Sequence, residues 1–202
     1  MTAIPVPPAV VIGRDLLAPF LAAARQEYRD CTPEAPPGCF AVLVGTLDED
    51  AAEVLRIEHA ENVRAVDRTA EAEFAASVVP CFGAAYANRR RGFWCSSRDL
   101  LRIHRAADRD GLEVLGSIHL HPDWHHIGPP AERGLRISQR PTPMDRYMFA
   151  HTGYPVNMIC YLETPDPTPA PTPPPTDFLA AWAPPPHPDA PECPELTLKY
   201  RD

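Results

Sequence analysis

The chain contains no long hydrophobic run and no excess of positive charge, and both absences narrow the functions it can have. No apolar stretch approaches the roughly 20 residues of a membrane span, and the first residues lack the basic segment and apolar core of a secretion signal. We therefore expect a soluble, cytoplasmic protein. The formal net charge is -8, which argues against nucleic acid or an anionic membrane as the main partner.

Paired cysteine motifs are also absent. The six cysteines include no Cys-x-x-Cys pair and are scattered along the chain. Several of them lie in apolar segments that are typical of strands. This distribution favours buried thiols in a reducing compartment over the alternative, a framework of disulfides.

Proline, in contrast, is abundant, with 27 residues, and it is concentrated between Thr164 and Pro175. A segment of this composition forms an extended polyproline-type chain and cannot pack a core. It is typical of a stiff surface loop, and the alternative is a ligand for an aromatic groove on another protein. Strand-like residues return at 178–182 and 196–201, so we predict a single domain, 1–202, with a proline-rich insertion at about 164–176.

The hydrophobic pattern predicts a domain of the α/β (α+β) class. Residues 14–28 repeat apolar side chains on one helical face, and residues 100–109 follow a serine-rich helix start. Segments typical of buried strands occur at 39–45, 54–62 and 154–162, and segments typical of edge strands at 9–12 and 196–201. We therefore predict a single mixed β-sheet flanked by helices.

Two histidines at the end of a predicted strand are the most informative part of the sequence. The apolar run 111–118 leads directly into His119 and His121, and Pro122 stops the strand. Residues i and i+2 of a strand point to the same face, so both imidazoles can approach one point. Two neutral imidazoles on a rigid strand form half of a zinc site. The alternative is a polar pair on an exposed face of the sheet.

The other half of such a site is best sought at residues 141–145, Pro-Thr-Pro-Met-Asp. Zinc hydrolases use three protein ligands and leave the fourth position to water, and Asp145 would supply the third ligand. The same residues are a good helix start, with Thr142 as N-cap, Pro143 in the first turn and an acid at the third helical position. The two roles are compatible, because a ligand at a helix start is well oriented.

The order of these residues resembles that of the JAMM (MPN-plus) metalloproteases, zinc enzymes that remove ubiquitin or ubiquitin-like and sulfur-carrier proteins from their conjugates. The shared pattern is a strand, Gly-x-x-His-x-His-Pro, a hydroxyl residue three positions before an aspartate, a helix, and a Tyr-Pro strand at 154–162; the resemblance covers roughly residues 9–162. It implies a JAMM or cytidine-deaminase-like architecture. It also implies Zn²⁺ as cofactor, Thr142 in place of the serine that helps to bind the oxyanion, and three metal ligands, His119, His121 and Asp145.

The sequence departs from the family pattern at the catalytic base. In the family a glutamate lies seven residues before the glycine that closes the first strand, and counting back from Gly45 reaches Gly38. The nearest acid is Glu34, which could act as the base through a rearranged loop. Proton transfer by a positioned base contributes typically about 10²- to 10⁴-fold to a rate. Glu34, another acid, or poor turnover are the three alternatives.

Two further segments carry candidate functional residues. An insertion at 123–141 contains Trp124, His125 and His126, whose imidazoles either contact substrate or a second metal or lie exposed in the loop. Three consecutive arginines at 89–91 either dock an acidic partner tail or are solvated, and solvation is the commoner case for such a charge run.

Two functions follow from these observations. The first is a zinc-dependent hydrolase of an amide or isopeptide bond, acting at the C-terminus of a ubiquitin-like or sulfur-carrier protein or on a small-molecule amide. The second is a catalytically impaired JAMM-fold binding or scaffold module that keeps the metal. Both predict a bound ion.

Overall fold

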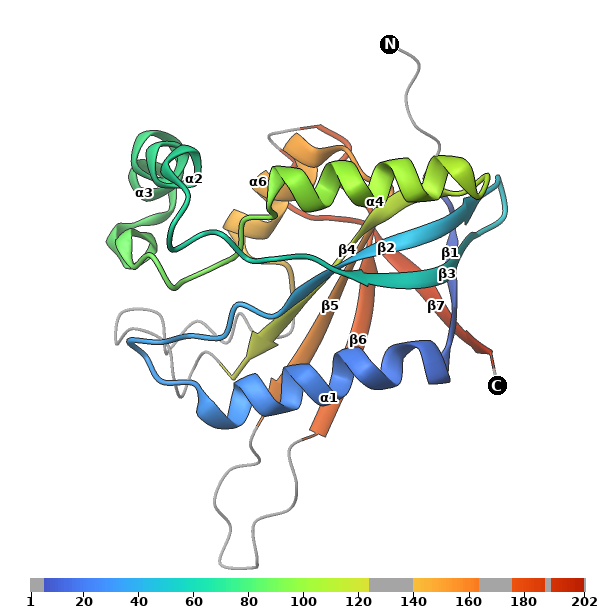
Figure 1. Cartoon of the computed structure of the whole chain (residues 1–202), viewed down its shortest axis with the longest axis horizontal. Helices are drawn as coiled ribbons and strands as arrows, with labels where there is room; N and C mark the ends of the chain where they lie inside the picture. Colours follow the sequence, from blue (N-terminus) through green and yellow to red (C-terminus); the bar gives the residue numbers. More distant parts are fainter. Residues whose placement is uncertain (1–5, 124–139, 164–175, 188–189, 202) are drawn as a thin grey trace, which may run out of the picture.

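The computed structural model describes residues 6–123, 140–163, 176–187 and 190–201. Two segments named above lie wholly or mainly outside these residues: the proline-rich stretch 164–175, and the insertion with Trp124, His125 and His126. In chain order (Figure 1), the elements are β1 (Ala9–Gly13), α1 (Arg14–Asp30), β2 (Phe40–Leu47), β3 (Ala52–His59), α2 (Arg68–Glu73), η1 (Phe74–Val78), α3 (Val79–Phe82), η2 (Ala84–Ala87), α4 (Ser97–Arg109), β4 (Glu113–Pro122), α6 (Pro143–Thr152), β5 (Val156–Glu163), β6 (Thr176–Trp182) and β7 (Glu195–Arg201).

The seven strands form one closed, mixed β-barrel in the order β1-β3-β2-β4-β5-β6-β7. Strand β2 lies antiparallel to β3 and β4, whereas β4 and β5 run parallel to each other. Strand β6 lies antiparallel to both β5 and β7, and β1 runs parallel to both β3 and β7. The pairing of β7 with β1 closes the ring.

This closure corrects the predicted fold class. The expected open mixed sheet flanked by helices, in the manner of JAMM and cytidine deaminase domains, is wrong for this chain. The two segments predicted as edge strands pair with each other instead, over a register that runs from Ala9↔Thr197 to Gly13↔Arg201. The hydrophobic pattern of a short strand does not indicate which other strand it pairs with. Joining two sheet edges satisfies backbone N–H and C=O groups that an open sheet would leave exposed.

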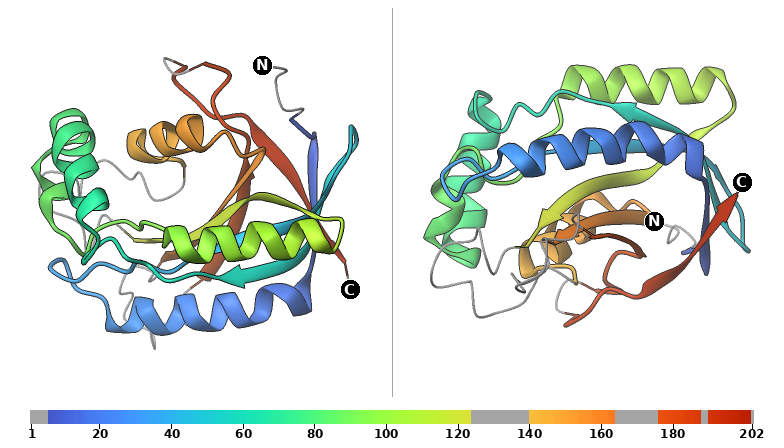
Figure 2. Two further views of the ribbon diagram at one scale, coloured as in Figure 1. Left: turned by 45° about the horizontal axis from the view of Figure 1, so that its top comes forward. Right: turned by 90° about the horizontal axis from the view of Figure 1, so that it is seen from below.

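Helices α1 and α4 pack on opposite faces of β2, and this explains why that strand is apolar along its whole buried length. Ala41 and Leu43 belong to the core cluster that includes Phe20 of α1, whereas Val42 and Val44 pack with Ile103 of α4. Successive strand residues alternate between faces, so a strand covered on both sides has no polar face. Figure 2 shows α1 and α4 on either side of these strands.

A group of short helices, residues 68–87, stands beside the barrel, and we refer to it as the helical lobe (Figure 1). Its buried residues Phe74, Val78 and Tyr86 form a cluster with Met144 of α6. The Tyr147 hydroxyl of α6 also donates a hydrogen bond to Glu73 at 3.3 Å. The lobe is therefore joined to the helix that carries the candidate ligand Asp145. No helix in the described part of the chain is long and apolar enough to cross a membrane.

Candidate metal centre

The two histidines lie at the end of β4, a strand that is paired on both sides. His119 is in register with Phe40 of β2 and with Ile159 of β5, and His121 is in register with Tyr161 of β5. Leu120, between them, belongs to the core cluster on the opposite face. The pleat therefore fixes both imidazoles on one side of a rigid strand.

Asp145 is placed by the start of α6, where a capping box orders its carboxylate. The backbone N–H and the hydroxyl of Thr142 each donate to Asp145 Oδ2 at 2.6 Å, and the backbone N–H of Asp145 donates to Thr142 Oγ1 at 3.2 Å. Thr142 is the N-cap and Pro143 occupies the first helical turn. Since β4 and β5 are parallel, the connection between them carries the start of α6 to the end of β4 where the histidines lie.

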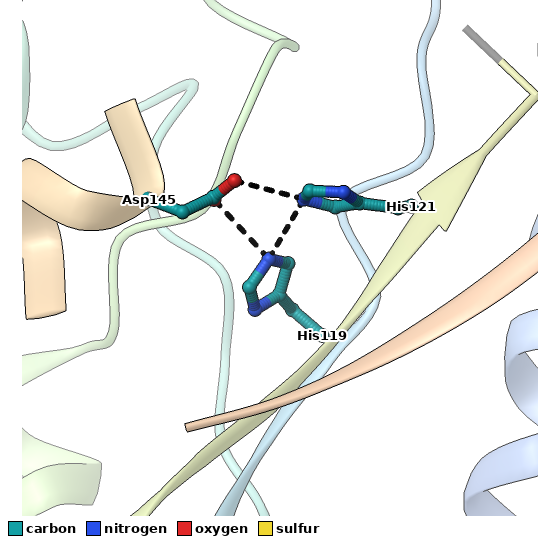
Figure 3. A group of neighbouring side chains, drawn as sticks. All are labelled: His119, His121 and Asp145. Carbon is teal, nitrogen blue, oxygen red and sulfur yellow. Dashed lines mark hydrogen bonds and ion pairs between the residues drawn. The ribbon is translucent and has the colours of Figure 1, made fainter. Parts of the chain in front are cut away.

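The three side chains converge on one point from these two elements (Figure 3). The Nε2 atoms of His119 and His121 lie 3.0 Å apart. Asp145 Oδ1 lies 3.3 Å from His119 Nε2, and Asp145 Oδ2 lies 3.2 Å from His121 Nε2. Ligand atoms around a tetrahedral zinc ion, with bonds of about 2.0–2.1 Å, lie about 3.3–3.4 Å from one another. The group His119, His121 and Asp145 could therefore hold a metal ion.

His119 and Asp145 have the protonation states that a metal requires. The exposed fraction is 6% for the His119 side chain and 13% for the side chains of His121 and Asp145. Burial lowers the pKa of His119 despite the adjacent carboxylate, so the imidazole is neutral at neutral pH. Burial alone would raise the pKa of Asp145, but the neighbouring His121 and His119 outweigh it and hold that pKa well below its usual range. A neutral His119 and an ionised Asp145 are the forms in which these two groups bind a metal ion.

A cavity of about 110 Å³ opens at the three ligands. A single water needs about 10–15 Å³ measured in this way, so the cavity has room for a substrate group beside an ion. Most of its wall is apolar, and the wall includes Thr142 and Arg91 besides the ligands. Cys39 also lines it, but burial, together with Glu27, raises the pKa of this thiol to about 12, which excludes a thiolate nucleophile at neutral pH.

The structure does not bring Glu34 into this cavity. Glu34 is exposed, in the turn where the backbone N–H and C=O of Thr32 and Ala35 bond to each other, and its own carbonyl accepts from Asn88 Nδ2 at 3.1 Å. The following residues Pro36, Pro37 and Gly38 line the cavity, but Glu34 does not. Its role as the base stays a prediction. Thr142 does line the cavity, with its hydroxyl bonded to Asp145.

The space beside Gly38, where the resemblance to the JAMM metalloproteases leads us to expect a glutamate, is closed by Asn62, a residue that the sequence reasoning missed. Asn62 Nδ2 donates to the carbonyls of Gly38, at 3.0 Å, and Gly92, at 3.3 Å, and its Oδ1 accepts from the backbone N–H groups of Arg64 and Trp94. A Cβ atom on Gly38 would lie 2.5 Å from that same Nδ2. A side chain at position 38 is therefore incompatible with Asn62 as it stands.

The sequence reasoning also missed the burial of Arg91. Arg91 is 7% exposed and lines the cavity, although it belongs to an arginine run that favoured a solvated loop. The aromatic residue Phe93, two positions later, is a signal that this segment turns inward, and its ring stacks on Phe40 of β2 with centroids 4.7 Å apart.

Fold and site together define a closed, mixed β-barrel protein with a buried two-histidine, one-carboxylate group that could hold a metal ion. Comparison with models of protein families finds no match, and comparison with curated proteins finds none either.

Proposed function

We propose that this chain is a zinc-dependent hydrolase that cleaves an amide or isopeptide bond. The observation that carries the proposal is the convergence of His119, His121 and Asp145 at a cavity with room for a substrate group. Two imidazoles and one carboxylate are a donor set that hydrolytic zinc sites use, with the fourth position left to water. A bound zinc ion supplies a Lewis acid for the carbonyl and acidifies a water molecule.

The remaining residues act on orientation and on the substrate. The Thr142 hydroxyl and backbone N–H hold Asp145 Oδ2, which fixes the direction of the carboxylate. The same hydroxyl is the group that would turn to donate to a developing oxyanion, because Thr142 lines the cavity. The apolar wall limits water around the reacting carbonyl and strengthens these interactions.

The resemblance to the JAMM metalloproteases supports this proposal through the ligand motif alone, because the architecture differs. By that resemblance the substrate is the C-terminus of a ubiquitin-like or sulfur-carrier protein, or a small-molecule amide. Asp145 is the sole carboxylate among the described residues that line the cavity. We therefore expect turnover to depend on Glu34 moving inward, or on an acid from outside the described cavity wall.

One observation favours a second candidate function. Gly38 lies where the resemblance leads us to expect the glutamate, and Asn62 fills the space beside it. A chain that binds the metal ion and a partner molecule, but has no efficient catalytic base, would act as a binding or scaffold module. Zinc content does not separate the two functions, whereas hydrolysis does.

The test begins with the metal. Protein prepared without added zinc and then loaded should bind one zinc ion per chain, measured by elemental analysis after gel filtration. His119→Ala and Asp145→Ala should lose it, and His59→Ala, an exposed histidine at the end of β3, should keep it. Absence of bound zinc in the wild type, or preferential retention of iron, would refute the zinc site.

The second step is hydrolysis by the zinc-loaded wild type. The substrates are fusions of ubiquitin-like and sulfur-carrier proteins and a panel of small amides, and the wild type should cleave at least one of them. His119→Ala should lose this cleavage, and Glu34→Gln is compared in parallel. Zinc binding without any metal-dependent cleavage would refute the proposed hydrolase function and favour the binding or scaffold module.

A further inference from the structure

Strands β6 and β7 are neighbours in the barrel, but they pair over a short length. Among their described residues only Ala181↔Leu196 and Trp182↔Glu195 are in register. Beyond these pairs the two strands separate (Figure 1), and an opening of about 520 Å³ lies between them. Residues 178–180 and 195–198 line the opening together with Tyr200, and we call it the β6–β7 seam. Its volume lies within the range of about 300–1,000 Å³ that is typical of ligand sites.

The backbone of β7 presents hydrogen-bonding groups to this seam. The backbone N–H of Thr197 donates to the carbonyl of Pro8, on the side of β1, at 3.1 Å. Successive residues of a strand direct their N–H and C=O groups to opposite sides. The groups of Leu198 and Tyr200 therefore point away from β1 and toward β6.

The backbone of β6 presents the same kind of edge from the other side. The pair Ala181↔Leu196 sets the register, and its continuation would place Leu179 opposite Leu198 with their N–H and C=O groups toward each other. The ladder between the described residues ends before that point. Two strand edges that face an opening in this way are a template for an extended chain, which can hydrogen-bond to the backbone of either edge.

The side chains along the seam alternate between two faces. Leu179 and Leu198 are partly buried and pack against the barrel core, and Tyr200 lies on the same face as Leu198. Phe178 lies on the other face, where it is 57% exposed and its ring centroid lies 5.9 Å from that of Tyr161. A strand added here would bury more of the two leucines, so it would need apolar side chains at alternate positions.

The charge beside the seam indicates which chain would fit. Lys199 is the only lysine in the sequence, is exposed, and has no ion pair with another described residue. Side chains of opposite charge on neighbouring strands stabilise a sheet, and like charges destabilise it. An acidic residue is therefore favoured next to Lys199. A second copy of this chain would bring its own lysine, and a lysine on an exposed edge opposes pairing between identical edges.

We propose that the β6–β7 seam binds an extended segment of a partner protein by strand addition. Apolar side chains of the segment, at alternate positions, contact Leu179 and Leu198, and an acidic residue between them lies beside Lys199. The backbone of the segment pairs with the free edges of β6 and β7. This site is separate from the metal group, and binding to it requires neither a metal ion nor hydrolysis.

The seam lies at the end of the barrel that carries the metal group. Phe178, Tyr161 and His121 are in register on β6, β5 and β4. Neighbouring strands are about 4.7–4.9 Å apart, so Phe178 lies about 10 Å from His121 across the sheet. A partner bound in the seam is therefore held close to the candidate metal centre.

The first measurement is amide hydrogen exchange, followed by NMR on the metal-free full chain without a ligand. The N–H of Leu198 faces the seam and should exchange at least about tenfold faster than those of Thr197 and Lys199, which lie on the side of β1. Equal protection of the three amides would show that the edge is covered and would overturn the proposal. A dimer on gel filtration with a protected Leu198 amide would show that a second copy fills the seam, and would overturn it too.

The second measurement uses the peptide acetyl-Thr-Val-Asp-Val-Thr-Val-Thr-amide, in which valines alternate with polar residues. Its binding should slow exchange at Leu198 and Leu179 by about tenfold or more, in the metal-free and the zinc-loaded protein alike. N-methylation of alternate residues keeps the side chains of the peptide and removes N–H donors, so it should weaken binding by about tenfold or more. Unchanged exchange at these amides, or equal binding of the N-methylated peptide, would overturn strand addition.

A charge exchange tests the position of the acidic residue. Lysine in place of the aspartate of the peptide should weaken binding by about two- to fivefold, and Lys199→Glu should reverse the order of the two peptides. The matched control is Arg105→Glu, the same change of charge at an exposed residue of α4, which should leave the order as in the wild type. Thermal unfolding establishes that each variant is folded. The same order of peptides in the wild type and in Lys199→Glu would overturn the acidic partner.

Discussion

Substitution of Thr142 by valine tests two roles of this residue, the capping of α6 and the orientation of the Asp145 carboxylate. Valine keeps the branched shape and removes the hydroxyl. That hydroxyl donates to Asp145 Oδ2 at 2.6 Å and accepts from the Asp145 backbone N–H at 3.2 Å. The backbone N–H of Thr142 still donates to Oδ2, so the carboxylate loses one of the two hydrogen bonds that this residue donates to it. The expected change is therefore partial in both stability and metal affinity.

The magnitudes follow from the two lost hydrogen bonds. Loss of an N-cap side chain costs about 0.5–2 kcal/mol of stability, which for a domain of this size lowers Tm by about 2–4 °C per kcal/mol. Loss of a residue that orients a metal ligand lowers metal affinity by about 10- to 100-fold. Thermal unfolding of the metal-free protein measures the first effect, and competition with a chromophoric chelator measures the second.

Thr142→Ser is the control, because serine keeps the hydroxyl; both quantities should stay near those of the wild type. A valine variant with lowered Tm but zinc affinity within twofold of the wild type would show that Thr142 only caps the helix. No change in either quantity would refute the capping box as a source of order at Asp145.

Three further predictions concern pH, the cavity edge and the barrel closure. Burial holds the pKa of His119 below its ordinary value of 6.5, so below about pH 6.5 the unfolded chain binds more protons than the folded chain. The free energy of unfolding of the metal-free protein should therefore be highest above about pH 6.5 and fall as the pH drops through the pKa of His119 in the folded state. The His119→Gln variant should show a flatter pH profile. Gly38→Ala should lower the free energy of unfolding by about 1–3 kcal/mol in urea titrations, because its Cβ would meet Asn62 Nδ2. If the changes in this free energy for Gly38→Ala and Asn62→Gly simply add in the double variant, that result would contradict the contact. Val11→Cys with Lys199→Cys should form a disulfide on oxidation, detected by peptide mass spectrometry, because these residues are in register on β1 and β7. Glu53→Cys with Lys199→Cys should not, since β1 lies between these strands; equal yields would refute the closure.

Local chemistry in the sequence was enough to predict the metal group. His119 and His121 share a face because strand residues alternate, and Thr142 to Asp145 starts a helix because its side chains can satisfy the first N–H groups. Both signals depend on neighbours within a few residues. The structure adds that the strand end and the helix start meet. Asp145 Oδ1 lies 3.3 Å from His119 Nε2, and Asp145 Oδ2 lies 3.2 Å from His121 Nε2.

Contacts between distant segments decided the rest. The parallel pairing of β1 with β7 closes the barrel, and two short strands at opposite ends of the chain carry no signal for each other. The burial of Arg91 depends on Tyr86 and Phe93 turning the arginine run toward β4, whereas charge pattern alone favoured solvent. Asn62 reaches Gly38 and Gly92 across the fold. The sequence by itself determined which residues are equipped to bind an ion, because that is a property of side-chain type and local geometry. Only the tertiary structure decided the closed barrel and the walls of the cavity, because those arise from pairings whose energy is shared between segments far apart along the chain.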